Sequence, residues 1–138
     1  MNFDIGLAEK ESDDNPVYYL QYAHARICNI LKYAEETGTK IGSEPNLTLL
    51  NEDEELSLIK SLIHFPETVM NALENLEPQT LASYLQGTAS EFHKFYSDHR
   101  VVTNDKELTM ARLFLVSAVR TVLANGLEIL GISQPEKM

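Results

Sequence analysis

Apolar residues recur three and four positions apart through most of this 138-residue chain, which is the spacing of amphipathic helices. Before the first such segment, Asn15 is a typical N-cap and Pro16 suits the first helical position, while Gly38 follows its last turn. Strand signals are weak. The expected helices cover residues 15–36, 52–64, 66–76, 79–97 and 106–130. The sequence therefore predicts an all-α bundle of about five helices at 15–138, preceded by a polar arm at 1–14.

The helical spacing also predicts which side chains face the core. Gly87 interrupts the fourth helix and is expected to weaken it, because glycine costs more to order than alanine. The expected apolar positions are Leu20, Ala23, Ile27, Ile30, Leu31 and Ala34 in the first helix, Leu56, Ile59, Leu62 and Ile63 in the second, Val69, Met70 and Leu73 in the third, Leu81, Leu85, Phe92 and Tyr96 in the fourth, and Leu113, Val116, Val119, Leu123, Leu127 and Leu130 in the fifth.

The first helix carries a second stripe, offset from its apolar one. Tyr19, Tyr22, Arg26, Asn29 and Tyr33 advance by three and four residues. Phenols and a guanidinium on one helix face suit the stacking and hydrogen bonding of unpaired bases. The alternative is that the tyrosines lie at the edge of the core with their hydroxyls in water. From the residues alone, this second interpretation is favoured.

The charge distribution bears on a nucleic-acid partner. The chain has a formal net charge of −10, whereas nucleic-acid binders usually carry basic patches that contact phosphates. Only residues 15–34 are basic, with a net charge of +2, and the neighbouring segment 35–56 has a net charge of −6. Either a polyanion approaches the basic segment while the acidic segments face away, or this helix merely lacks acids.

Motifs of catalysis are missing from the sequence. It contains no Gly-rich phosphate loop and no nucleophile elbow, and the acidic run 52–55 is interpreted as a helix N-terminus. His24 and Cys28 are four residues apart, but no second pair completes a four-ligand metal site. We therefore expect no catalytic residue, cofactor or metal in this chain. The single cysteine, the lack of an export signal and the short apolar runs favour a cytoplasmic location without a membrane partner.

Both ends of the helical region resemble one family. The run Asn-Pro-Val-Tyr-Tyr-Leu-Gln-Tyr-Ala-His-Ala-Arg-Ile at 15–27 resembles the opening helix of the DALR anticodon-binding domain of arginyl-tRNA synthetases, which are class I enzymes. Residues 122–127 and 130–132 are similar to the family's last helix, and residues 135–138 to its terminal Pro-Glu-x-Met. The resemblance covers nearly the whole chain and is least distinctive at 40–65. The motif that names the family reads Thr-Met-Ala-Arg at 109–112, so only its Ala-Arg end is clear.

This resemblance implies an all-helical domain whose partner is the anticodon loop of tRNA(Arg). It also implies a longer enzyme that attaches arginine to this tRNA with ATP and magnesium. Arg100 falls where some members have an aromatic residue, so the sequence departs from the family's pattern at this position. Phosphate contacts are expected from Arg26, Lys32, Lys94 and Arg100. The anticodon-binding residues expected by position are Tyr19, Tyr22, Arg26, Tyr96, Arg100 and Met138.

The catalytic motifs of that family do not occur in this sequence. Neither a His-Ile-Gly-His-like nor a Lys-Met-Ser-Lys-like segment is present, so we expect the chain alone to be unable to activate arginine. In the full-length enzyme the domain is expected to adjoin the catalytic domain, and in isolation to be a monomer. Two alternatives are the helical domain of another class I synthetase such as cysteinyl, against which the first-helix motif argues, and a protein-interaction bundle without an RNA role.

Overall fold

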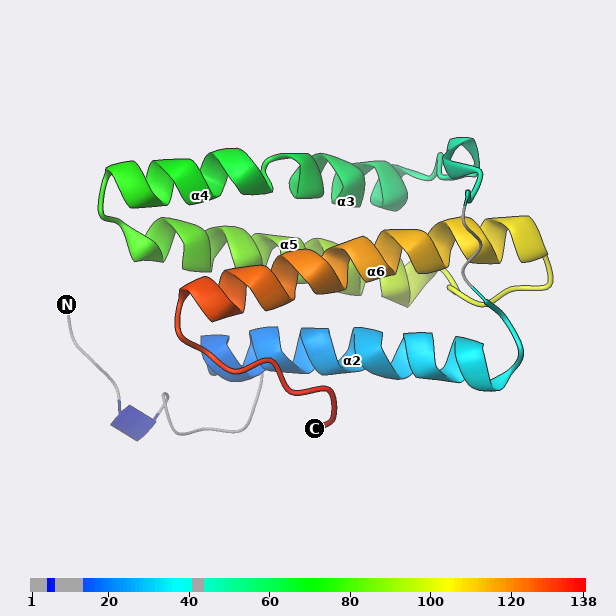
Figure 1. Cartoon of the computed structure of the whole chain (residues 1–138), viewed down its shortest axis with the longest axis horizontal. Helices are drawn as coiled ribbons and strands as arrows, with labels where there is room; N and C mark the ends of the chain where they lie inside the picture. The colour runs from blue at the N-terminus through cyan, green and yellow to red at the C-terminus, as the bar shows by residue number, and fades with distance from the viewer. Residues whose placement is uncertain (1–4, 7–13, 41–43) are drawn as a thin grey trace.

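The computed structural model describes residues 5–6, 14–40 and 44–138, and from Pro16 onward the regular elements among these residues are helices, without strands (Figure 1). The prediction of an all-α bundle is confirmed. The proposed arm at 1–14 lies mostly outside the described residues, so its role as a linker stays a prediction. The elements are α2 (Pro16–Glu36), the 3-10 turn η1 (Leu47–Leu49), α3 (Asp53–Ile63), α4 (Phe65–Glu74), α5 (Pro78–Asp98) and α6 (Lys106–Ile129).

Local signals place the ends of α2 where the sequence predicts them. The Asn15 side chain accepts a hydrogen bond from the Val17 amide at 3.1 Å, and Pro16 occupies the first turn, where a missing N–H costs nothing. Beyond the last turn, Gly38 has a φ of 83°, a left-handed conformation that glycine adopts without strain. These signals fix the start and length of the helix that carries the tyrosine stripe.

The helices pack side by side in a bundle (Figure 1). Only His64 separates α3 from α4, and Pro66 follows at the start of α4, so the two helices form one broken rod along α5. On the other side of the bundle α2 packs against both α5 and α6. By length and composition α6 could cross a membrane, but half of its most apolar window is buried in the bundle, as in the central helix of many soluble proteins. This arrangement makes α5 and α6 the centre of the fold.

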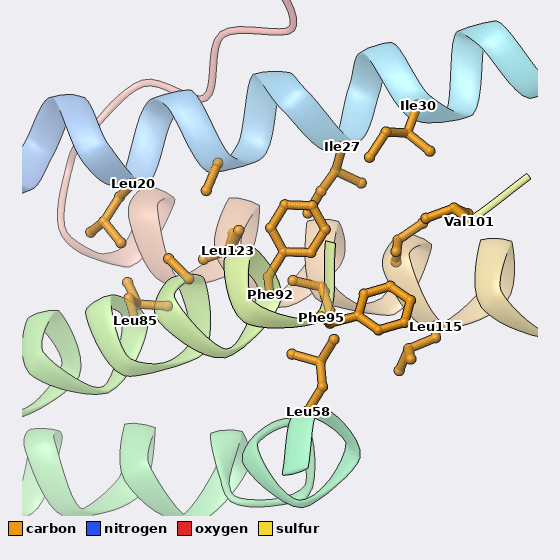
Figure 2. Close-up of a cluster of buried hydrophobic side chains, with 14 of the residues drawn as sticks. Leu20, Ile27, Ile30, Leu58, Leu85, Phe92, Phe95, Val101, Leu115 and Leu123 are labelled. Atoms are coloured by element: carbon orange, nitrogen blue, oxygen red, sulfur yellow. The ribbon is translucent and has the colours of Figure 1, made fainter. Parts of the chain in front are cut away.

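The core lies where α2, α5 and α6 meet. Figure 2 shows Phe92 and Phe95 of α5 pointing between Ile27 of α2 and Leu115 of α6, with Leu58 of α3 closing the cluster. The predicted apolar faces of α2, α5 and α6 are largely buried, which confirms them. On α5 the exception is Tyr96, which is 39% exposed.

The predicted faces of α3 and α4 are partly wrong. Leu58 and Ala72, which were not expected in the core, are buried instead. The broken rod meets the bundle mainly through α5, so each of its helices buries only a narrow face. Exposed apolar side chains remain along the rod, and they include four residues expected inside, namely Leu56, Ile63, Met70 and Leu73.

Two glycines in long helices differ in what surrounds them. A Cβ built on Gly126 would lie 2.5 and 2.7 Å from the two methyl groups of Leu85, so glycine lets α6 approach α5 closely, whereas a Cβ on Gly87 meets nothing within 4 Å. Both alanine variants gain the same helix propensity of ~0.5–1 kcal/mol. We expect the free energy of unfolding of Gly126→Ala to be ~1–3 kcal/mol lower than that of Gly87→Ala, because only the methyl group added at position 126 overpacks the core. Urea unfolding of both variants measures this difference, and equal stabilities would contradict it.

Candidate nucleic-acid interface

A cleft of about 760 Å³ lies between the C-terminal half of α2 and the end of α5 with the turn that follows. Three residues of the tyrosine stripe face it, which places the predicted stripe beside a second wall from a distant segment. The lining residues are Arg26, Asn29, Ile30 and Tyr33 from α2, and Tyr96, Ser97, Asp98, His99, Arg100, Val101 and Val102 from the second wall.

Arg26 sits between two aromatic rings at one end of this cleft. Its guanidinium carbon lies 4.9 Å from the ring centre of Tyr22 and 5.3 Å from that of Tyr96. The same guanidinium donates a hydrogen bond to the Tyr22 hydroxyl at 2.8 Å. Contact with two rings holds the guanidinium plane in place while other N–H groups remain for a ligand. Tyr22 and Arg26, predicted on one helix stripe, and Tyr96, expected from the family resemblance, therefore form one cluster, which we call the Arg26 clamp.

The rings of the clamp are supported from behind. Tyr18 stacks on Tyr22 with ring centres 6.3 Å apart, and the buried ring of Phe92 stacks on Tyr96 at 5.8 Å. Tyr96 thus has one face against the core and an edge that remains partly exposed. The ring is thus held by Phe92 and by the Arg26 guanidinium, so little side-chain freedom is lost when a base packs against its exposed part.

Tyr19 lies away from the cleft. Its ring centre is 5.3 Å from that of His93, and the side chain packs against the hydrophobic core. It follows the other tyrosines along the helix but is turned toward α5, so the core-edge interpretation describes this residue best. Its predicted contact with RNA stays a prediction.

Arg100 and the C-terminal residue are placed very differently. Arg100 is exposed on the wall of the cleft opposite α2. Met138 does not line the cleft. The tail before it is bound to another flank of α2, where Gln21 donates to the Ser133 carbonyl at 3.1 Å and the His24 ring meets the Pro135 carbonyl at 2.8 Å. At 3.6 residues per turn this flank points away from Arg26.

Each wall of the cleft carries one arginine. Arg26 and Arg100 contribute cationic groups, and Asp98 is the acidic residue in the lining. The other predicted phosphate contacts lie elsewhere, since Lys32 pairs with Glu36 at 4.0 Å and Lys94 is exposed on α5 outside the lining. At the acidic start of α3, Glu54 contacts the His99 ring at 3.0 Å, and this hydrogen bond lowers the pKa of Glu54.

Two groups of potential metal ligands occur among the described residues. Glu52, Glu54 and His99 bring three ligand atoms within 4.8 Å of one another, but Glu52 is exposed and the other two already pair. Cys28 lies 3.9 Å from the His24 ring, and burial raises the pKa of its thiol. A protonated thiol is a poor metal ligand and nucleophile, so this pair has the chemistry of a packed side chain.

The sequence model of one protein family, the DALR anticodon binding domain, matches residues 20–138. The chain belongs to this family. The DALR match leaves out only the arm and the first turn of α2, and the Arg26 clamp falls entirely within it.

Relatives of this DALR domain agree with the match. An arginine–tRNA ligase of Geotalea daltonii is 52% identical over 99% of the chain, and one of Salinibacter ruber is 46% identical over all of it. The solved arginyl-tRNA synthetase of Thermus thermophilus superposes on the whole chain with a TM-score of 0.84 at 33% identity, and covers it with 24% of its own length. The chain spans 25% of the length of the two ligases.

Sequence reasoning did not identify the inner supports of the second wall. Arg112 was recognised as part of a motif, but its contacts with Glu55 and with the Arg100 carbonyl could not be read from spacing. Ser97 lies in the last turn of α5, and His99 and Val102 lie in the segment after it, which bears no periodic pattern. The one usable signal was the clear Ala-Arg end of the family motif, which marks Arg112 without showing its partners.

Proposed function

We propose that this domain binds the anticodon loop of tRNA(Arg) as part of a longer arginine–tRNA ligase. The observation that carries the proposal is the Arg26 clamp beside a cleft whose other wall ends at Arg100. Loop nucleotides are unpaired, so their bases are free to stack on aromatic side chains and on guanidinium planes. Membership in the anticodon-binding family supports the same conclusion.

The clamp and the cleft have separate tasks in this proposal. Tyr96 and Tyr22 offer ring surfaces to bases, a contribution of ~1–3 kcal/mol per stacked base. Arg26 and Arg100 contact phosphates or base edges from the two walls of the cleft and so set the register of the loop. The hydrogen bond between Arg26 and Tyr22 keeps the guanidinium in place before RNA arrives, which lowers the ordering cost of binding.

The chemistry of aminoacylation is assigned to the rest of the longer enzyme. Arginine, ATP and magnesium would be bound there, and this domain would hold the tRNA so that its acceptor end meets that site. On this proposal the domain alone is a cytoplasmic monomer without ligase activity. Arginine-dependent pyrophosphate exchange by the isolated chain would contradict the division of labour.

Binding of an anticodon stem-loop tests the proposal directly. We expect Tyr22→Ala to weaken binding by ~1–3 kcal/mol, because it removes a stacking ring and the hydrogen-bond acceptor that orients Arg26. The matched control is Leu20→Ala, a buried residue two positions away, which should lower the free energy of unfolding by ~2–5 kcal/mol and leave binding by the folded fraction unchanged. Titrations begin at low salt because of the net charge of −10.

Salt dependence separates the RNA-binding proposal from a protein-interaction bundle. Contacts between cationic side chains and phosphates release counterions, so the dissociation constant should rise steeply with salt. A Tyr22→Ala protein that is folded and binds the stem-loop as tightly as the wild type would exclude the clamp from recognition. Binding that is independent of salt would favour the protein-interaction alternative.

A further inference from the structure

The turn after α5 is held from inside the bundle by a buried arginine. Arg112 of α6 donates a hydrogen bond from Nη1 to the Arg100 carbonyl at 2.7 Å, and its guanidinium carbon lies 5.8 Å from the ring centre of Phe95. Arg112 is buried, whereas the Arg100 side chain is exposed in the cleft. The backbone that carries Arg100 is therefore anchored at its carbonyl, one residue before the buried Val101.

Glu55 of α3 orients this arginine. Its carboxylate is fully buried, and Oε2 accepts from Nε of Arg112 at 3.5 Å, while Oε1 has no hydrogen-bond partner. A buried ion pair costs much desolvation and is often no more stable than an apolar pair of similar size. Stability alone is thus a weak reason for placing Glu55 and Arg112 in the core, and the geometry they impose on the Arg100 carbonyl is a better one.

The same turn is anchored at two more points. Before the carbonyl, the His99 ring pairs with Glu54 at 3.0 Å. After it, the Thr103 amide donates to the Thr109 hydroxyl of α6 at 2.8 Å. Two adjacent acids in the first turn of α3 therefore hold two adjacent residues of the cleft wall. Glu54 contacts His99 directly, and Glu55 is linked to the Arg100 carbonyl through Arg112.

We propose that Glu55 and Arg112 are positioning residues for RNA recognition. By fixing the Arg100 carbonyl they set the wall at 99–102 at the distance from the Arg26 clamp that the anticodon loop requires. Arginine is needed at this position because its planar fork serves the Glu55 carboxylate and the Arg100 carbonyl at once, which a lysine ammonium on a flexible stem does not reproduce. The RNA part of this inference rests on the proposed function, whereas the hold on the turn does not.

The test replaces the ion pair by an apolar pair, so that folding and positioning are separated. We expect the Glu55→Leu, Arg112→Met double variant to melt at or above the wild-type temperature, because no buried charge is left unpaired. Its dissociation constant for an anticodon stem-loop should nevertheless rise about 10-fold, since the wall is no longer pre-organised. Amide hydrogen exchange at residues 100–102, followed by NMR without RNA, should become faster in the same variant.

Each result decides the inference. If amide exchange at 100–102 is unchanged, Glu55 and Arg112 do not hold the turn. If exchange is faster but RNA affinity equals that of the wild type, the hold on the turn has no role in recognition. If the wild type binds no RNA, the proposed function fails, but the exchange measurement still tests the hold. Arg112→Lys supplies the same two readouts if the double variant does not fold, and Lys106→Met, at the exposed start of α6, is the control for loss of a cation.

Discussion

Phe92→Ala should lower the free energy of unfolding by ~3–5 kcal/mol, because it empties the space between α2 and α6 (Figure 2). Tyr96→Ala, one turn later on α5, should lower it by ~1 kcal/mol or less, since that ring is partly exposed and loses mainly its stacking on Phe92. Thermal and urea unfolding of the two variants give this comparison between two aromatic residues of one helix.

RNA binding should reverse the order of the two variants. Tyr96→Ala removes one side of the Arg26 clamp, so we expect the anticodon stem-loop to bind ~1–3 kcal/mol more weakly. The folded fraction of Phe92→Ala should lose less affinity than Tyr96→Ala, because the Phe92 ring supports Tyr96 but is not among the residues that line the cleft. If the Tyr96 variant is as unstable as the Phe92 variant, or binds RNA as the wild type does, Tyr96 belongs to the core and not to the interface.

The sequence predicted the helices well where the signal was local. Asn15, Pro16 and Gly38 act on the backbone within a few residues of themselves, so their effect does not depend on the rest of the fold. The buried stripes of α2, α5 and α6 were also readable, because each of these helices packs against at least two others and buries a broad face. Such a face tolerates an error of one position in the pattern.

The site was predictable only in part, because spacing along the sequence shows which residues share a helix face but not which helices meet. Tyr22 and Arg26 share one helix face, so their spacing brought them together without a structure. Tyr96 and Arg100 were assigned by resemblance to the family, and the structure brings them to the same cleft. The support of that cleft by Glu55 and Arg112 joins residues 57 positions apart, and spacing carries no information about such a pair.

The error in α3 has a physical cause, and a pair of substitutions tests it. The predicted face assumed that every carboxylate is exposed, which excluded Glu55 and shifted the face toward Leu56. The observed buried face also follows helical spacing, and it consists of Glu55, Leu58, Ile59 and Leu62. Leu58 is 0% exposed and Leu56 is 42% exposed. We therefore expect Leu58→Ala to lower the free energy of unfolding by ~2–5 kcal/mol and Leu56→Ala to change it by ~0.5 kcal/mol or less. Urea unfolding of both variants distinguishes the observed face from the predicted one, because a rod turned toward Leu56 would reverse the two values.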